Sequence, residues 1–189
     1  MTKKEQIIQT AEDLFFHFGF RRLTIQEICE KAQVSRKTFY TYFKGKDDLV
    51  REIVEAFMEK AFDAFEMLLN DNTLNFAEKL EKSILMKHEM GKKWSFAFFS
   101  DLLSDEKISA YYHSLIGRSA AMLHDMLESA QKNKEIDPNL NINYIIWMLE
   151  KQSEHLNDKE LLRFFTDIED MIQQMTQVFV YGISAPPKK

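Results

Sequence analysis

Residues that break helices are scarce in this chain, and this scarcity limits its fold more than any other feature. The 189 residues include five glycines and three prolines, and two of these prolines are Pro186 and Pro187 near the C-terminus. Leu, Ile, Met, Phe, Lys and Glu fill the long stretches in between, and most of them favour helix over other structures. The sequence therefore predicts an all-α fold.

Apolar residues at helical spacing predict the first helix over residues 3–18, and the pattern stops at Gly19, a residue suited to close a helix. A second helix is expected to begin after Thr24. In the run Thr24-Ile25-Gln26-Glu27, the Thr hydroxyl and the Glu carboxylate can each bind a free amide at the helix start, which is a capping box.

A short break at Gln33 and Val34 separates this second helix from a third, which Ser35 is expected to cap. Phe39 and Phe43 lie four residues apart and predict its inner face. Two short helices joined by a tight turn form a helix-turn-helix.

A long amphipathic helix is predicted to begin after Gly45, because Asp47 and Asp48 suit the first turn of a helix and apolar residues follow at helical spacing. The last predicted helix carries more than one apolar stripe, so two of its surfaces need to be covered. Further helices are expected near residues 75–91, 94–103, 106–133, 139–155 and 158–181.

Charge divides the chain into a basic head, residues 1–46, and an acidic body, residues 47–183. The head holds nine Lys and Arg against five Asp and Glu, although the whole chain has a net charge of -5. A basic segment of this kind suits a nucleic-acid partner. We expect residues 184–189 to form a disordered tail.

The run from Leu23 to Leu49, LTIQEICEKAQVSRKTFYTYFKGKDDL, resembles the signature of the TetR family of transcriptional regulators. It departs from the family pattern at Gln33 and Lys37, where the family commonly has glycine. The resemblance implies an N-terminal three-helix helix-turn-helix domain, joined by a long helix to a C-terminal helical domain for ligand binding and dimerisation. About nine helices are expected in all.

We expect double-stranded operator DNA as the main partner. Arg36 and Lys37 begin the helix that would enter the major groove, where each can donate to a guanine. Backbone amides at the two helix starts and the hydroxyl groups nearby are expected to contact phosphate or sugar. For Lys46, the family resemblance implies a phosphate contact. The alternatives are ordinary surface cations for Arg36 and Lys37 and packing roles for the two tyrosines. The predicted DNA-binding residues are Thr24, Ser35, Arg36, Lys37, Thr38, Tyr40, Tyr42 and Lys46.

The body is rich in methionine and aromatic residues, which suit a deformable apolar pocket as well as ordinary core packing. The family resemblance implies an effector pocket in this half, so a small apolar effector is expected. The predicted pocket residues are Phe62, Phe65, Met86, Met90, Phe98, Phe99, Tyr111 and Met122.

A homodimer formed by the last two helices is also expected, because their apolar surface exceeds one stripe and two heads are needed to read two half-sites. The predicted interface residues are Ile145, Phe165, Ile168, Met171, Ile172 and Met175.

Other classes of function are disfavoured by the sequence. The five histidines show no close ligand spacing, and Cys29 lies on an apolar helix face, so neither a metal nor a cofactor is predicted. There is no nucleophile elbow or phosphate-binding glycine loop, so an enzyme is not expected. A single cysteine and the lack of a long apolar run or signal peptide favour the cytoplasm over a membrane.

These observations predict a repressor that a small lipophilic effector releases from its operator. One alternative is a DNA-binding protein of the same fold that organises chromosomes or binds partner proteins without a ligand switch. Another is a ligand-binding helical bundle with a vestigial head, which the intact capping signals disfavour.

Overall fold

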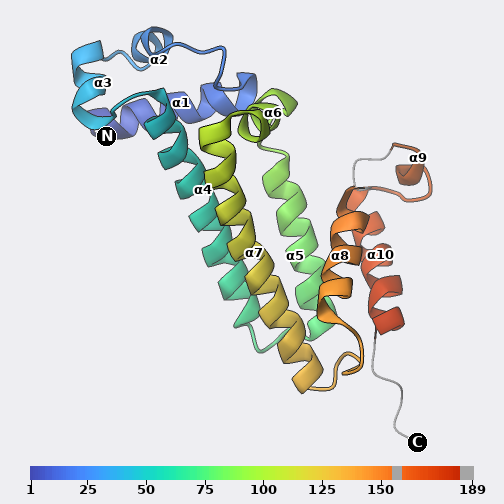
Figure 1. Ribbon diagram of the computed structural model, residues 1–189. Helices are drawn as coiled ribbons and strands as arrows, with labels where there is room; N and C mark the ends of the chain where they lie inside the picture. Colours follow the sequence, from blue (N-terminus) through green and yellow to red (C-terminus); the bar gives the residue numbers. More distant parts are fainter. Residues whose placement is uncertain (155–158, 184–189) are drawn as a thin grey trace, which may run out of the picture. The chain divides into compact units, whose positions relative to one another are not determined.

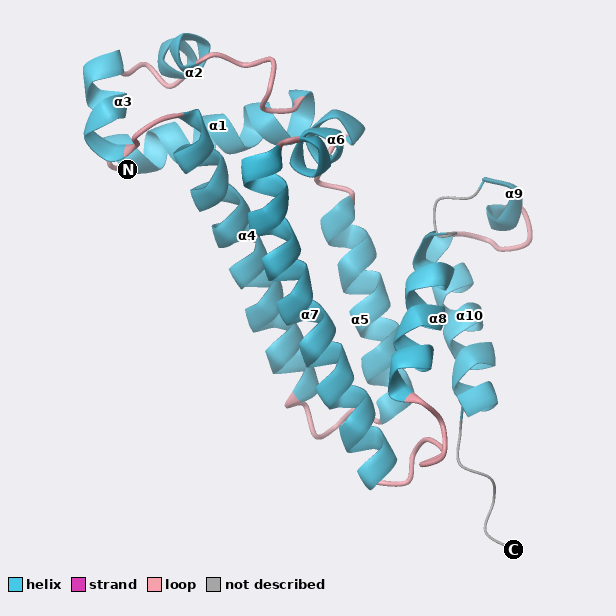
Figure 2. Cartoon of the chain, viewed as in Figure 1, coloured by secondary structure: helices cyan, strands magenta, loops and turns pink. Residues whose placement is uncertain are grey.

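The structure is a computed structural model that describes residues 1–154 and 159–183, and every regular element in these ranges is a helix (Figures 1 and 2). The all-α prediction is confirmed. The helices are α1 (Lys3–Phe18), α2 (Ile25–Lys31), α3 (Arg36–Tyr42), α4 (Lys46–Leu69), α5 (Phe76–Gly91), α6 (Phe96–Ser104), α7 (Glu106–Lys132), α8 (Ile142–Glu154), α9 (Lys159–Leu162) and α10 (Ile168–Ile183).

The last predicted helix is divided into the single turn α9 and the longer α10. The reason is a capping signal around Asp167: its carboxylate accepts the backbone N–H of Asp170 at 2.9 Å, while the Asp170 carboxylate accepts that of Thr166 at 3.0 Å. These bonds satisfy amides at a helix start, so a new helix begins here. The predicted tail lies outside the described residues.

Contacts divide the chain into two compact units. Unit 1 consists of Met1–Phe62 and Met90–Ile116, and unit 2 of Asp63–Glu89 and the described residues from Gly117 onward. Helices α4 and α7 contribute residues to both units. Packing thus groups part of the predicted body with the head, and the expected functional boundary after residue 46 stays a prediction. Within the described ranges, none of the helices has the length and apolar character needed to cross a bilayer.

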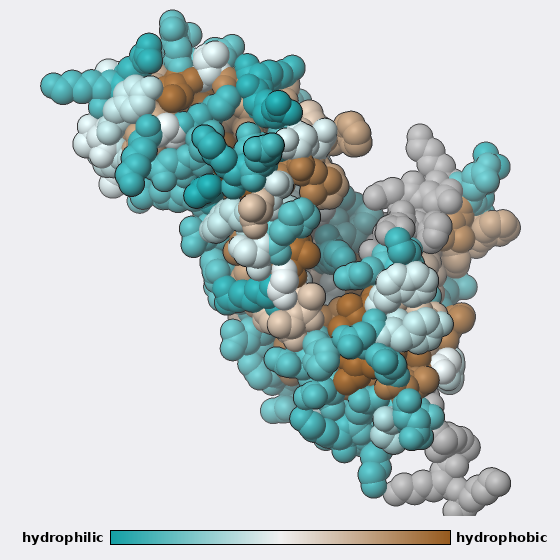
Figure 3. Space-filling view, viewed as in Figure 1, coloured by the Kyte–Doolittle hydropathy of each residue, from teal (hydrophilic) through white to brown (hydrophobic). Residues whose placement is uncertain are grey.

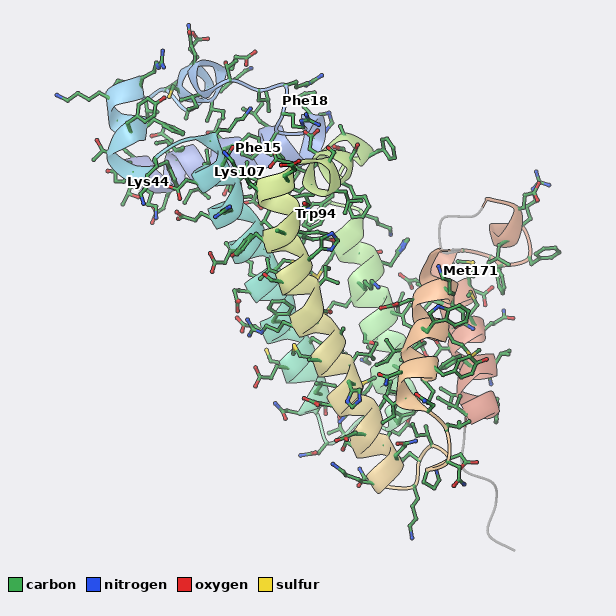
Figure 4. All side chains as sticks on the ribbon, viewed as in Figure 1. Phe15, Phe18, Lys44, Trp94, Lys107 and Met171 are labelled. Carbon is green, nitrogen blue, oxygen red and sulfur yellow. The ribbon has the colours of Figure 1, made fainter. Side chains whose placement is uncertain are left out.

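The core of unit 1 contains a cluster of aromatic rings from α1, α4, the segment before α6, and α6 itself. The ring of Phe16 lies 5.4 Å from that of Phe57 and 5.0 Å from that of Phe98, between ring centroids. Trp94, labelled in Figure 4, contacts the rings of both Phe57 and Phe98, at 4.9 and 5.2 Å. Aromatic pairs at these separations stabilise a core beyond the area that they bury.

Hydrogen bonds also join α6 to the end of α1. The backbone N–H of Ser95 donates to the carbonyl of Phe16 at 2.8 Å, and the Asp101 carboxylate accepts the backbone N–H of Arg21 at 2.8 Å. Between these two bonds, Gly19 has a φ of 79° and a ψ of 160°. A β-carbon there would lie 2.6 Å from the Asp101 carboxylate, so the close approach of α6 needs glycine.

Unit 2 has its own core, in which α5, α7, α8 and α10 pack together. Its buried residues are Phe76, Leu80, Met126, Leu127, Ala130, Ile136, Ile145, Leu149, Phe179 and Ile183, and a smaller cluster contains Met171 and Ile172. The two faces of α10 differ, because Val178 and Tyr181 stay exposed.

Substitution Gly19→Ala is expected to lower the free energy of unfolding by about 1–3 kcal/mol, because this backbone conformation is nearly restricted to glycine and the added carbon meets Asp101. Chemical denaturation measures the change. Gly117→Ala is the control: Gly117 lies inside α7 with open space around it, so alanine there should stabilise by about 0.5–1 kcal/mol. Equal effects of the two substitutions would contradict the role given to Gly19.

Candidate nucleic-acid interface

The start of α2 is fixed by the capping box that the sequence predicts. The backbone N–H of Glu27 donates to the Thr24 hydroxyl at 3.2 Å, and the Glu27 carboxylate accepts the backbone N–H of Thr24 at 2.7 Å. The Thr24 hydroxyl also donates to this carboxylate at 2.7 Å. This bond is the main reason why the pKa of Glu27 is lowered from its ordinary value. Glu27 is thus ionised near neutral pH and holds the helix start in place.

The turn between α2 and α3 is a Schellman motif. The backbone N–H of Val34 donates to the carbonyl of Cys29 at 3.0 Å, and that of Gln33 donates to the carbonyl of Glu30 at 3.2 Å. Gln33 has a φ of 50°, the left-handed conformation that favours glycine. The family that the sequence resembles commonly has glycine at this position. Glutamine forms the same turn here, at a cost in backbone strain.

Helix α3 begins at Ser35, whose hydroxyl accepts the backbone N–H of Thr38 at 3.0 Å and lies 2.9 Å from the Thr38 hydroxyl. Its inner face is the predicted one: Phe39 and Phe43 are buried, with ring centroids 5.4 Å apart. The helix is therefore held by its own core contacts, and its other side chains are left for a partner.

Arg36 and Lys37 are exposed in the first turn of α3. Tyr40 and Tyr42 are 49% and 41% exposed, so neither tyrosine is a core residue. Both rings thus remain accessible to a partner, although the Tyr40 ring also contacts Phe39 edge-on, at 5.4 Å between ring centroids. Figure 3 shows the mostly hydrophilic surface of this part of unit 1.

Lys46 has a role that the sequence did not predict. Its ammonium donates to the carbonyl of Arg21 at 3.1 Å and to that of Leu23 at 2.7 Å, which ties the first turn of α4 to the loop before α2. Two of its three donors are therefore used inside the head. Sequence reasoning missed these bonds because their partners lie more than twenty residues away. Lys44, labelled in Figure 4, is exposed nearby and can reach a phosphate freely.

The predicted pocket residues are not brought together in one unit. Phe62, Met90, Phe98, Phe99 and Tyr111 belong to unit 1, where Phe62 and Phe98 are core residues and Phe99 is 41% exposed. Burial is the main cause that raises the pKa of Tyr111 to about 12, and a hydrogen bond to Glu55 adds to it.

The other three predicted pocket residues, Phe65, Met86 and Met122, are partly buried in unit 2. None of the eight lines a cavity of about 90 Å³ that lies between α5, α7, α8 and α10 in the described part of unit 2. Sequence reasoning missed this cavity, because a gap between four helices leaves no local pattern.

The predicted interface residues are mostly used inside unit 2. Ile145, Met171 and Ile172 are buried, which corrects the expectation that they lie on a free surface; Met171 is labelled in Figure 4. Phe165 and Met175 are partly buried against the smaller cluster, and the Ile168 side chain lies outside the described part. The exposed large side chains of α8 and α10 are Tyr144, Trp147, Val178 and Tyr181.

Comparison with known proteins identifies the family. The sequence model of "Bacterial regulatory proteins, tetR family" matches residues 7–53, which span α1, the helix-turn-helix and the first turns of α4. Residues 7–53 are thus a TetR-family domain. The helix-turn-helix of the head is therefore of the TetR type, the DNA-binding element of the transcriptional regulators in that family.

Relatives extend this likeness over almost the whole chain. The HTH-type transcriptional regulator YdgC of Bacillus subtilis is 24% identical over 184 residues, which cover 95% of this chain and 92% of the relative. Two solved structures share the fold at lower identity.

The first is the transcriptional regulator FadR of Bacillus subtilis in complex with stearoyl-CoA, with a TM-score of 0.71 and 18% identity; the match covers 95% of this chain and 99% of that one. The second is the ketosteroid transcriptional regulator KstR2 of Mycobacterium tuberculosis, with a TM-score of 0.65 and 17% identity, covering 98% and 96% of the two chains. At these identities the likeness concerns the fold.

Substitution Gln33→Gly is expected to raise the free energy of unfolding by up to about 1 kcal/mol, because glycine relieves the strain of the left-handed backbone conformation. The greater entropy of glycine in the unfolded chain offsets part of this gain. Thermal and chemical denaturation measure the change. Gln26→Gly is the matched control: Gln26 lies inside α2 without a positive φ, so glycine there should cost about 1 kcal/mol. A loss of stability for Gln33→Gly would contradict the strain at this turn.

Proposed function

We propose that the protein is a homodimeric repressor whose affinity for operator DNA is lowered by a small lipophilic effector. The observation that carries the DNA-binding part is the first turn of α3: Arg36 and Lys37 are exposed there, while Phe39 and Phe43 anchor the same helix from behind. A rigid helix with free cations at its start suits readout of base edges in the major groove.

Two relatives support the effector and repressor parts of the proposal, one part each. The solved FadR of Bacillus subtilis is in complex with stearoyl-CoA, and KstR2 of Mycolicibacterium smegmatis is named a transcriptional repressor, matching 38% of this chain at 24% identity. An effector can release DNA only to the extent that it binds the DNA-free form more tightly. A coupling of about 1–3 kcal/mol would appear as a 5- to 150-fold loss of operator affinity.

Exposed aromatic and apolar side chains support a dimer through α8 and α10. Trp147 is 53% exposed, and Val178 and Tyr181 are 73% and 76% exposed, although the other faces of both helices are buried. Large exposed apolar groups of this kind mark interaction surfaces, and hydrophobic patches over this part of unit 2 can be seen in Figure 3. We therefore move the proposed interface from the buried residues of the sequence prediction to these exposed ones.

Footprinting on the DNA upstream of the protein's own gene tests the proposed function directly. A discrete protected site that weakens when a lipophilic compound raises the melting temperature of the protein is the expected result. Loose coverage without a defined site would favour an architectural protein, and no protection would indicate a vestigial head. Protection that no stabilising compound changes would remove the effector from the proposal.

Arg36→Ala and Lys37→Ala are each expected to weaken binding to the operator by about 1–3 kcal/mol and to reduce the preference for it over a scrambled duplex. Each side chain is exposed, so the melting temperature should stay unchanged. Titrations of both duplexes at several salt concentrations measure this. An unchanged preference in both variants would overturn the assignment of base readout to α3.

Lys44→Ala and Lys46→Ala are expected to differ. Lys44→Ala should weaken binding to all sequences and reduce the salt slope by about one, because one phosphate contact is lost, and should leave stability unchanged. Lys46→Ala should also lower the melting temperature, because two carbonyls of the loop lose their donor. A Lys46→Ala variant with unaltered stability would show instead that Lys46 contributes only a contact to a DNA phosphate.

Val178→Glu is expected to yield a folded monomer with little operator affinity, because it puts a charge into the proposed interface. Sedimentation and thermal unfolding at micromolar concentration measure assembly and stability. Met67→Glu is the control, since Met67 is 76% exposed but lies on α4; this variant should remain a dimer. If the unaltered protein sediments as a monomer, the proposed interface is contradicted.

A further inference from the structure

The cavity of unit 2 contains a polar atom that the fold leaves without a partner. The cavity has a volume of about 90 Å³ and is lined mainly by Leu80, Ile84, Leu123, Leu149, Ile172 and Met175. Thr176 of α10 also lines it, and this residue is 3% exposed. No described residue offers its hydroxyl oxygen a hydrogen-bond partner.

An unpartnered hydroxyl at this depth is unusual. Most buried polar side-chain atoms in folded proteins have a partner, because burying an unsatisfied hydroxyl is unfavourable. Threonine inside a helix commonly satisfies its hydroxyl on a carbonyl of the preceding turn, and Thr176 does not. The hydroxyl is therefore free to bind a group that enters the cavity.

The remaining lining restricts what that group can be. Lys87 and Glu150 are both exposed and have opposite charges, so the cavity offers no excess of one sign. The Ser83 hydroxyl already donates to the carbonyl of Leu80 at 2.7 Å. An ionised ligand group at the buried Thr176 would lose its hydration, which is unfavourable, whereas an uncharged oxygen needs only the one hydrogen bond that the hydroxyl can donate.

We propose that this cavity binds an uncharged, mainly apolar molecule through one oxygen, a carbonyl or a hydroxyl, that hydrogen-bonds to Thr176. A cavity of about 150 Å³ holds one benzene molecule, which has six heavy atoms. By proportion, this cavity of about 90 Å³ holds about four heavy atoms, or one end of a longer molecule. In the proposed function, this ligand would be the effector and this cavity its site. Only that biological role rests on the proposed function. Binding itself is measured without DNA.

The probes are 2-butanone and 2-methyl-1-butene, which have nearly the same shape, although only the ketone accepts a hydrogen bond. Each is titrated into the full chain with ¹³C-labelled Ile, Leu and Met methyl groups. We expect saturable shifts at Ile84, Ile172 and Met175 with a dissociation constant on the order of millimolar, and none at Ile7 or Ile53 in unit 1. The ketone should bind about two- to tenfold more tightly than the alkene.

Variants of Thr176 separate the hydrogen bond from the cavity. Thr176→Val keeps the shape of the side chain, so it should remove the preference for the ketone and leave the affinity for the alkene unchanged. Thr176→Ser keeps the hydroxyl and should keep the preference. Ser83→Leu should fill the cavity and abolish the binding of both probes.

The proposal is overturned if neither probe produces saturable shifts, which would indicate a void that holds only water. It is also overturned if the ketone keeps its advantage in Thr176→Val, because the hydrogen bond would then lie elsewhere. Should the probes bind as expected while operator affinity stays the same in their presence, the site is supported and the effector part of the proposed function fails. The two proposals can thus fail separately.

Discussion

The packing of aromatic rings in unit 1 is the contact on which the arrangement of its helices depends. Phe16, Phe57 and Phe98 come from α1, α4 and α6, and their rings meet at centroid distances of 5.0–5.4 Å. Trp94 adds a fourth ring to the same cluster. Because rings of this size bury large apolar areas, the three helices hold one another in place, and the small helices α2 and α3 are presented on a rigid base.

Sequence patterns were sufficient where the structure is set by neighbours along the chain. The capping box of Thr24 and Glu27 and the inner face formed by Phe39 and Phe43 involve residues three or four positions apart, and all of them were found from the sequence. The cap at Asp167 is equally local, and could have been read from the nearby Thr166 and Asp170. It was missed because the apolar spacing continues across it.

Features that join distant segments could not be predicted in the same way. The carbonyls that accept from Lys46 become its neighbours only after α1 and α4 have packed. On α8 and α10, apolar residues occur on more than one face. Composition does not tell which of these faces packs against other helices of the same chain. Ile145 and Met171 are inside, whereas Trp147 and Val178 are outside. Thr176 did leave a signal, since it is a polar residue at helical spacing between the buried Ile172 and Phe179.

The loop between α1 and α2 is held from two sides, by Lys46 of α4 through its carbonyls and by Asp101 of α6 through the N–H of Arg21. This arrangement matters for protein engineering. A chimaera that transfers only residues 1–46 to another body would keep the lysine but lose the aspartate and the helix that Gly19 accommodates. A transferable reader of DNA cut from this chain would need the segment that carries α6 as well, although that segment follows more than forty residues later in the sequence.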